Sequence, residues 1–215
     1  MRSLWRRVRG FWEHDPGLSA ILGLTVLFVF VLPPMASPRG ERGVLMDAAF
    51  ALLVFAGVAG LTVPRPLRIA LLALAATATI VRAWPASSDS AVSMASLASV
   101  GLMTTVVLAQ AFRGGVVNIH RVQGAVAAYL LLGVAFGFAY ELLSAFVPAA
   151  FATAATVELP YRGWQYFSFV TLTTTGYGDV TPVHPVARSL TMLEALTGQL
   201  YPAILLARLV ALQTR

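Results

Sequence analysis

The chain has 215 residues, of which 58% are hydrophobic and only 11% charged, whereas about a quarter of the residues in a usual soluble domain carry charge. Its formal net charge of +6 does not indicate nucleic-acid binding, because basic residues in a membrane chain report orientation. The absence of cysteine excludes disulfides and thiolate metal sites. These proportions predict an integral membrane protein.

Residues 1–17 are expected to form a cytoplasmic, interfacial segment. The stretch RSLWRRVRGFW interleaves arginine with apolar and aromatic residues, a pattern typical of an amphipathic helix that lies against anionic lipid. An ordinary basic tail that only fixes topology is the alternative. The next apolar block is expected to be retained rather than cleaved as a signal peptide, because PPMASPRGERG and further apolar blocks follow it.

Apolar residues collect into six blocks of spanning length, since a helix needs about 20 mostly apolar residues to cross a membrane. Arginines concentrate before the first block, after the second and fourth, and at the C-terminus, so both termini are expected in the cytoplasm of a multi-pass protein of the cell (inner or plasma) membrane. Trp84 and Trp164 are expected to anchor outer boundaries, and His120 and His184 to be solvated residues at span edges. The six blocks are 18–33, 44–62, 67–84, 91–112, 122–147 and 185–212.

Residues 18–113 are expected to form a four-helix transmembrane unit. No basic residue lies between Ala91 and Phe112. One elementary charge across about 100 mV is worth about 2.3 kcal/mol, so steep voltage gating requires several charges, and little or no intrinsic voltage dependence is predicted. Arg82, at the outer edge of the third block, is expected to snorkel toward water.

Residues 147–184 contain a short apolar run, WQYFSFVTLT, that cannot span a membrane. Irregular backbone at membrane depth is tolerated only where it is buried in protein or lines a watery cavity, so this loop is expected to enter from outside and return. Pro160 suits the first turn of a short helix over 161–173. The partially negative C-terminal end of that helix would face the middle of the membrane and stabilise a cation.

The stretch TLTTTGYGDVTP follows this helix. A cation that sheds its water in a membrane needs a shell of oxygens, because desolvating a bare charge costs on the order of tens of kcal/mol. Backbone carbonyls can supply the shell if Gly176 and Gly178 adopt positive φ, which glycine does at little steric cost. Thr174 would add its hydroxyl, while the side chains of Thr175 and Tyr177 would point away from the axis.

This stretch resembles the selectivity filter of the potassium-channel family, which reads T-V/I-G-Y-G-D. The resemblance implies a homotetramer with one such loop per subunit, which binds K⁺ and needs no other cofactor. It also implies that K⁺ is coordinated by the residues of the strand, Thr174, Thr175, Gly176, Tyr177 and Gly178. Valine or isoleucine is commoner at position 175, and threonine there is expected to modify inactivation more than selectivity.

Six spans with a pore loop between the last two resemble the voltage-gated-like superfamily, here of a prokaryotic type without an arginine-rich fourth helix. The expected fold is therefore an all-α integral membrane protein with six transmembrane helices per subunit, a re-entrant pore helix and four-fold symmetry. The first four helices would resemble a voltage-sensor domain without gating charges. The pore domain would cover residues 114–215, with outer helix 122–147, pore helix 161–173, filter 174–179 and inner helix 185–212.

Four further residues are expected to support the filter or the gate. Asp179 would concentrate cations at the outer mouth and hydrogen-bond Tyr166 behind the loop. Glu141 would contact the pore surround, as a similarly placed acid does in the family. Gly198 matches the family's gating-hinge glycine, with close helix packing as the alternative.

The inner helix also carries Pro202, which is expected to kink it. Glu194 cannot face lipid, because a charge there costs several kcal/mol. It either approaches the cavity or hydrogen-bonds pore-helix groups such as the threonine cluster, and we favour the second. The GVAFG segment, residues 133–137, has a GxxxG spacing and is expected to pack against the inner helix.

The sequence thus predicts a channel that conducts K⁺ passively. A non-selective cation channel is one alternative, although such filters commonly lose the tyrosine or the second glycine, and both are present here. A cation transporter built from several pore loops in one chain is another, and a tetramer would exclude it. An enzyme is not expected, because no catalytic triad, metal or phosphate-binding set gathers on one side of the membrane. The expected partners are identical subunits and membrane lipids, including anionic lipid at the N-terminus, and no nucleic acid.

Overall fold

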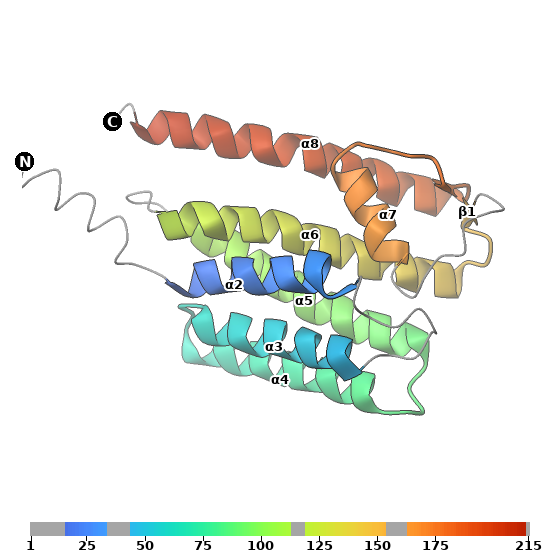
Figure 1. Cartoon of the computed structure of the whole chain (residues 1–215), viewed down its shortest axis with the longest axis horizontal. Helices are drawn as coiled ribbons and strands as arrows, with labels where there is room; N and C mark the ends of the chain where they lie inside the picture. Colours follow the sequence, from blue (N-terminus) through green and yellow to red (C-terminus); the bar gives the residue numbers. More distant parts are fainter. Residues whose placement is uncertain (1–15, 34–43, 113–118, 154–162, 214–215) are drawn as a thin grey trace, which may run out of the picture.

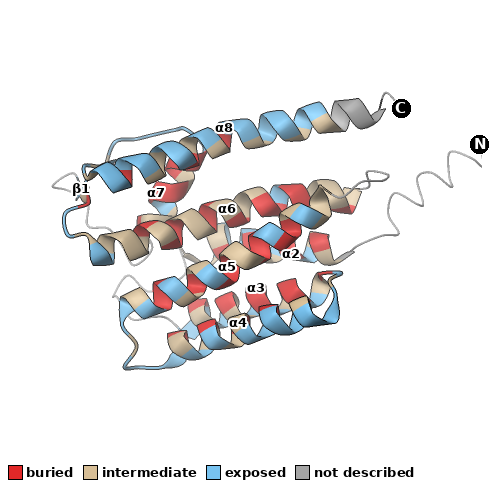
Figure 2. Cartoon of the chain, turned by 180° about the vertical axis from the view of Figure 1, so that it is seen from behind, coloured by how far each residue is buried: buried red, intermediate tan, exposed pale blue. Residues whose placement is uncertain are grey.

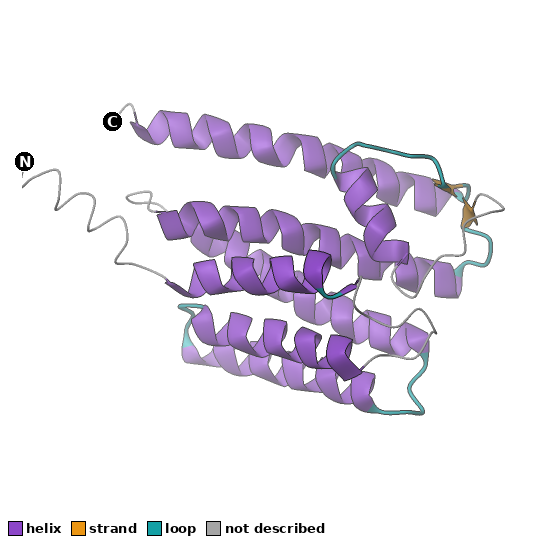
Figure 3. Ribbon diagram, in the orientation of Figure 1, coloured by secondary structure: helices purple, strands orange, loops and turns teal. Residues whose placement is uncertain are grey.

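The computed structural model describes residues 16–33, 44–112, 119–153 and 163–213, with the backbone alone for residues 209–213. The arginine-rich stretch of the predicted interfacial segment lies outside these ranges, so its contact with anionic lipid stays a prediction. Within them the regular secondary structure is helical apart from one short strand pair (Figure 3). The elements are α2 (Pro16–Val26), the π-helical turn η1 (Leu27–Val31), α3 (Val44–Gly60), α4 (Arg65–Ala83), α5 (Asp89–Ala111), α6 (Ile119–Phe146), β1 (Phe151–Thr153), α7 (Gly163–Leu172), β2 (Val180–Pro182) and α8 (Pro185–Gln213).

Four of these helices are long and apolar enough to cross a membrane, namely α4, α5, α6 and the Pro185–Arg208 part of α8. Gly17–Val31 and Val44–Gly60 are apolar but shorter. The 17 residues of α3 rise about 26 Å, slightly less than the roughly 30 Å of hydrocarbon. The predicted helical architecture is therefore confirmed, with four candidate membrane spans among the described residues, and the count of six spans stays a prediction.

The helices α2 to α6 form one bundle, α8 runs along its edge, and the short α7 crosses between α6 and α8 (Figure 1). The core lies among α2, η1, α3, α4, α5 and α6. There the ring of Phe50 contacts the rings of Phe28 and Phe138, each at a centroid distance of 6.1 Å. Because α6 contributes to this core, the four-helix unit and the helix assigned to the pore pack as one body.

The expectation that Arg82 snorkels to water is wrong. Arg82 is only 5% exposed. Its guanidinium forms an ion pair with Asp47 on α3, with an N–O distance of 2.9 Å. The guanidinium also donates to Ser96 Oγ on α5 at 3.0 Å and lies over the Phe50 ring at 4.6 Å. The half-buried Asp47 carboxylate offsets the cost of turning the guanidinium inward.

The expectation that His120 is a solvated boundary residue is also wrong. His120 is buried at the start of α6, and its Nδ1 lies 2.6 Å from Ser19 Oγ on α2. His184, by contrast, precedes α8, and its Nδ1 accepts a hydrogen bond from Val186 N at 3.3 Å. It therefore caps the first turn of α8.

The strand pair was not predicted. β1 and β2 are antiparallel, with Phe151 opposite Pro182 and Thr153 opposite Val180. β1 follows α6 and β2 follows the loop after α7, so the ladder ties the end of that loop to the C-terminal end of α6 (Figure 1). Trp164, which was expected to be an interfacial anchor, packs against β1. Its ring centroid lies 4.7 Å from that of Phe151.

Candidate functional site

The helix α7 is seated in a groove of α6 lined by the two glycines of GVAFG. A Cβ at Gly133 would lie 2.8 Å from Phe169 Cζ, and one at Gly137 would lie 2.5 Å from the Gln165 amide. Both partners belong to α7, so the expectation that this segment packs against the inner helix is wrong. The GxxxG spacing permits close approach, but it does not specify which helix approaches.

The C-terminal end of α7 rests on α8 at Gly198. A Cβ at this position would lie only 1.8 Å from the carbonyl oxygen of Leu172, the last residue of α7. Tyr129 Oη on α6 donates to the same oxygen at 3.2 Å. Gly198 therefore allows close helix packing, which was the alternative to a gating hinge. Its role as a hinge stays a prediction.

Glu194, one turn before Gly198, joins three helices. Glu194 is fully buried, and one of its carboxyl oxygens accepts a hydrogen bond from Tyr140 Oη on α6 at 2.5 Å. The other carboxyl oxygen lies 2.5 Å from Ser168 Oγ on α7, which in turn lies 2.7 Å from the Gly133 carbonyl oxygen. Ser168 has one hydroxyl proton and can donate it to only one of these two oxygens. The side chain thus faces α7 and α6, and its partners are a serine and a tyrosine rather than the threonine cluster.

The backbone after α7 alternates in conformation. Thr174, Gly176 and Gly178 have positive φ of 57°, 58° and 78°, while Thr175 and Tyr177 between them do not. Positive φ is uncommon for threonine, so Thr174 is a strained position that the surrounding contacts must hold. Such alternation turns successive peptide groups so that their carbonyls can face one side of the strand.

Hydrogen bonds to α7 fix the start of this strand. The N–H of Thr174 donates to Thr171 O at 2.9 Å, and that of Thr175 to Val170 O at 2.9 Å. Thr175 Oγ1 lies 2.9 Å from Thr173 Oγ1, which donates its own proton to Phe169 O at 2.7 Å. Thr175 is therefore the donor in the threonine pair, and its hydroxyl turns back toward the end of α7.

The outer end of the strand is tied to α7 by Tyr166. Tyr166 Oη donates to Asp179 Oδ2 at 2.8 Å, the pair expected from the sequence, and Asp179 Oδ1 accepts from Val180 N at 3.0 Å. The Tyr166 ring stacks on that of Tyr177, with a centroid distance of 6.4 Å and an interplanar angle of 6°. The hydrogen bond to Asp179 raises the pKa of Tyr166.

The C-terminal half of α8 is anchored by Tyr201, a residue that was not among those predicted from the sequence. Tyr201 Oη donates to the Ala125 carbonyl of α6 at 2.7 Å. Arg208 donates to the Phe112 carbonyl at the end of α5 and lies over the Phe112 ring at 5.0 Å. Pro202 lies within α8, between these two contacts. In the sequence, the feature that could have drawn attention to Tyr201 is its position next to Pro202 within an apolar helix.

Glu141 lies near the end of α6, where its backbone carbonyl accepts from Ser144 Oγ at 2.8 Å. The loop that it was expected to contact includes residues 154–162, which lie outside the described ranges, so this contact stays a prediction. Among the described residues, no group of three or more His, Cys, Asp or Glu could hold a metal ion. The oxygens offered by this site are therefore backbone carbonyls and threonine hydroxyls.

The strand and much of α8 are uncovered within one chain. Residues 173–178 are all exposed, Tyr177 by 70% (Figure 2). Along α8 an apolar row is exposed at a spacing of about one helical turn. The row consists of Met192, Leu196, Leu200 and Ile204. A single chain therefore presents one side of a site and an apolar face beside it.

Comparisons with known proteins cover this half of the chain. Residues 126–215 match the family model described as "Ion channel". Over 84 residues the chain is 38% identical to "Two pore potassium channel c" of Oryza sativa subsp. japonica, and over 86 residues 36% identical to "Protein LctB" of Geobacillus stearothermophilus. These matches cover 39% and 38% of this chain but only 17% and 62% of the two relatives.

No solved structure matches the chain. The matched family is a channel family and not an enzyme family, as the sequence predicted. The matches support an ion-channel family for a chain whose apolar helices fit a multi-pass membrane protein.

Proposed function

We propose that the chain is one subunit of a homotetrameric, potassium-selective channel that conducts K⁺ passively across the cell membrane. The observation that carries this proposal is the alternation of positive and negative φ over residues 174–178, directly after the C-terminal end of a short helix. The potassium channel named among the relatives supports the choice of ion.

Each subunit would supply one wall of the ion path. The carbonyls of Thr174, Thr175, Gly176 and Tyr177 and the hydroxyl of Thr174 would replace the water shell of K⁺, and Gly178 would complete the strand at its outer end. The partially negative C-terminus of α7 points at the inner end of this strand and would favour a cation there. The protein supplies spacing and charge, and no covalent chemistry is required.

Four copies are needed because one strand has oxygens on one side only. The exposed apolar row of α8 and the exposed Tyr177 would be buried between subunits, as contiguous apolar surfaces beside a site usually are. Both termini would lie in the cytoplasm. Because one subunit supplies only one wall of the ion path, the site would be incomplete without the other three subunits.

Gating would use the inner helix. Pro202 has no N–H to donate to the carbonyl of Gly198, four residues earlier, so the helix is weakened between these two residues. Strong intrinsic voltage dependence is not proposed, because α5 carries no basic residue and Arg82 on α4 is neutralised by Asp47.

A non-selective cation channel would share the same fold. The retention of Tyr177 with its bracing contacts to Tyr166 favours potassium selectivity, because a braced strand holds its oxygens at fixed spacing. A monomeric pore-loop transporter is disfavoured because the described residues contain one such strand.

The test is ion flux in liposomes that contain the purified protein. K⁺ flux is expected to exceed Na⁺ flux strongly, and Gly178→Asp is expected to abolish the difference, because aspartate resists the φ of 78° at that position. Thr181→Asp, which adds the same charge on β2, is the matched control and should keep selectivity. Equal K⁺ and Na⁺ flux through the unmodified protein would refute the assignment.

A further inference from the structure

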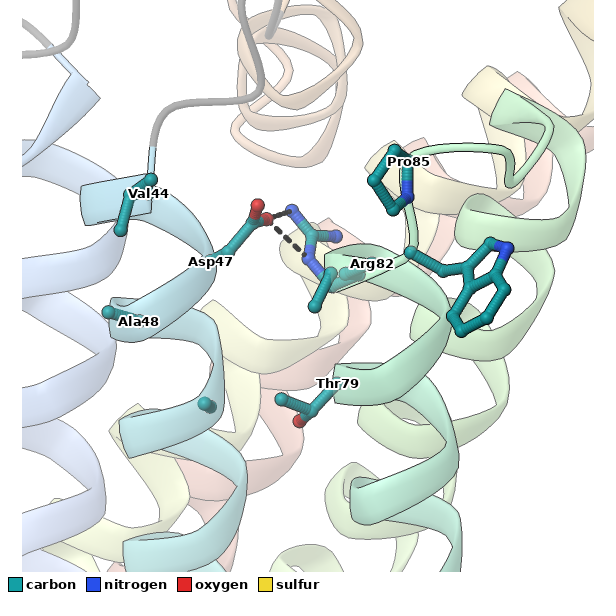
Figure 4. Close-up of a pocket in the computed structure, with 9 residues that line it drawn as sticks. Val44, Asp47, Ala48, Thr79, Arg82 and Pro85 are labelled. Atoms are coloured by element: carbon teal, nitrogen blue, oxygen red, sulfur yellow. Dashed lines mark hydrogen bonds and ion pairs between the residues drawn. The ribbon is translucent and has the colours of Figure 1, made fainter.

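A crevice of about 590 Å³ opens between α3 and α4, far from the filter strand (Figure 4). This volume lies in the roughly 300–1,000 Å³ range of small-molecule sites. Its walls are made of small or apolar side chains, and its polar lining comes chiefly from Asp47 and Arg82. The residues include Val44, Ala48, Ala51, Thr79 and Trp84.

In the proposed topology the crevice lies near the level of the outer lipid headgroups. It is formed by the first turns of α3 and the last turns of α4, which lie at the same end of the bundle as β1 (Figure 1). That end is the outer one in the proposed topology. Trp84 is 62% exposed at the rim, where an indole ring prefers the headgroup level. The outer face of α4 is exposed along its length, so the crevice opens toward lipid (Figure 2).

The two charges in the crevice are not equally accessible. Arg82 Nε and one terminal nitrogen both contact Asp47 Oδ1, at 3.0 and 2.9 Å, and the other terminal nitrogen donates to Ser96. The Arg82 side chain is 4% exposed, whereas that of Asp47 is 19% exposed. Among the described residues Asp47 Oδ2 has no hydrogen-bond partner, so the group that the crevice offers to a ligand is a carboxylate oxygen.

This arrangement selects the charge and the donors of a ligand. A phosphate without a neighbouring ammonium group would meet the carboxylate first and be repelled, because the guanidinium beneath is already engaged. A primary ammonium group carries three donors and matches an acceptor-only oxygen. A quaternary ammonium group carries the same charge but no N–H to donate.

We propose that this crevice binds an outer-leaflet phospholipid with a primary ammonium headgroup, a phosphatidylethanolamine. The ammonium donates to Asp47 Oδ2, and an acyl chain lies in the channel left by Ala48, Ala51 and Thr79. Arg82 positions the carboxylate and keeps the pair neutral overall, which disfavours purely anionic or purely cationic ligands. The inference rests on the proposed function only for the membrane topology, in which this end of the bundle is the outer one.

The experiment measures lipid binding to the detergent-purified full chain by native mass spectrometry. The probes are phosphatidylethanolamine, its N-methylated series up to phosphatidylcholine, and phosphatidylglycerol, all with identical acyl chains. Occupancy is expected to fall stepwise along the methylation series, by about tenfold in affinity at its end. Phosphatidylglycerol is expected to bind no better than phosphatidylcholine.

Two variants locate the site. Asp47→Asn should remove the preference, but it leaves a buried arginine without its counter-ion and can fail to fold. Ala48→Leu fills the crevice without touching the ion pair, and it should lower phosphatidylethanolamine occupancy about tenfold. Ala70→Leu, the same change at an exposed position of α4 outside the crevice, is the matched control.

Several results would overturn the proposal. One is equal binding along the methylation series, and another is a preference for phosphatidylglycerol. A third is an equal effect of Ala48→Leu and Ala70→Leu on lipid occupancy. The fourth is displacement of the lipid by free ethanolamine at comparable concentration, which would indicate a soluble amine as the ligand. K⁺ flux measured on the same samples separates the two proposals. Lost selectivity with intact lipid preference contradicts only the channel assignment, and the reverse result contradicts only the lipid site.

Discussion

Gly198 on α8 lies against the carbonyl oxygen of Leu172 at the end of α7, where a Cβ would stand 1.8 Å from that oxygen. No rotamer change can relieve this clash, because the obstacle is backbone. The helix α8 and the C-terminal end of α7 are therefore in direct backbone contact. Any bending of α8 at this residue would be transmitted to the end of α7.

Gly198→Ala is accordingly expected to lower stability by more than the roughly 1–3 kcal/mol of an ordinary overpacked site. Thermal unfolding in detergent and K⁺ flux in liposomes measure the effect. Gly101→Ala is the matched control, because nothing lies within 4 Å of its added Cβ. It should be neutral or stabilise α5 by about 0.5–1 kcal/mol. Equal effects of the two changes would contradict the packing role.

Glu194 should tolerate glutamine but not alanine. Ser168 has one hydroxyl proton and lies within hydrogen-bond distance of both the Gly133 carbonyl and Glu194. An amide can donate to Ser168 Oγ while its oxygen accepts from Tyr140, so Glu194→Gln completes the network. Glu194→Ala leaves the buried Tyr140 hydroxyl without this acceptor, at about 1–3 kcal/mol, while Ser168 can still donate to the Gly133 carbonyl.

Thermal unfolding in detergent is the appropriate measurement for the Glu194 series, because its contacts lie within one chain. Ser168→Ala should resemble Glu194→Ala. If glutamine proves as damaging as alanine, the carboxylate charge itself matters and the network described above is not the reason for its burial.

Tyr166→Phe should speed the loss of conductance during sustained activity while leaving K⁺ selectivity intact. The change removes the hydrogen bond to Asp179 but keeps the stacked ring against Tyr177. Single-channel recording in planar bilayers gives open-time decay and reversal potential separately. A shifted reversal potential would show instead that the hydroxyl sets the oxygen spacing.

The same hydrogen bond gives a pH dependence. It raises the pKa of Tyr166 above the ordinary tyrosine value of about 10. The stabilisation is therefore complete below a pH of about 10 and is lost as the pH rises through the raised pKa. The unmodified channel should inactivate faster in strongly alkaline external solution, whereas Tyr166→Phe should show no such increase.

Thr175→Val should leave selectivity unchanged and alter inactivation. Valine has nearly the same shape, but it cannot donate to Thr173 Oγ1 as Thr175 does at 2.9 Å. Bilayer recordings of the variant beside Thr173→Ser, which retains the acceptor hydroxyl, separate the lost hydrogen bond from a general disturbance. Altered Na⁺ permeability in Thr175→Val alone would contradict this assignment.

The helices and the filter strand could be predicted from the sequence because their signals are local. Long apolar blocks require helices in a membrane, and Gly176 and Gly178 are placed where the backbone needs positive φ. The positive φ of Thr174 was not predictable in the same way, since threonine does not favour it and only the hydrogen bonds to α7 hold it there.

The sequence by itself determined that this chain is an apolar helical protein and where the strand with alternating φ begins. Only the tertiary structure decided which partner each special residue meets. Arg82 turns inward to Asp47, the GVAFG groove receives α7 rather than α8, and Glu194 joins Ser168 to Tyr140. Periodicity shows which face of a helix is apolar or small, but the partner comes from a segment distant in the chain, and its identity depends on how all the helices pack at once.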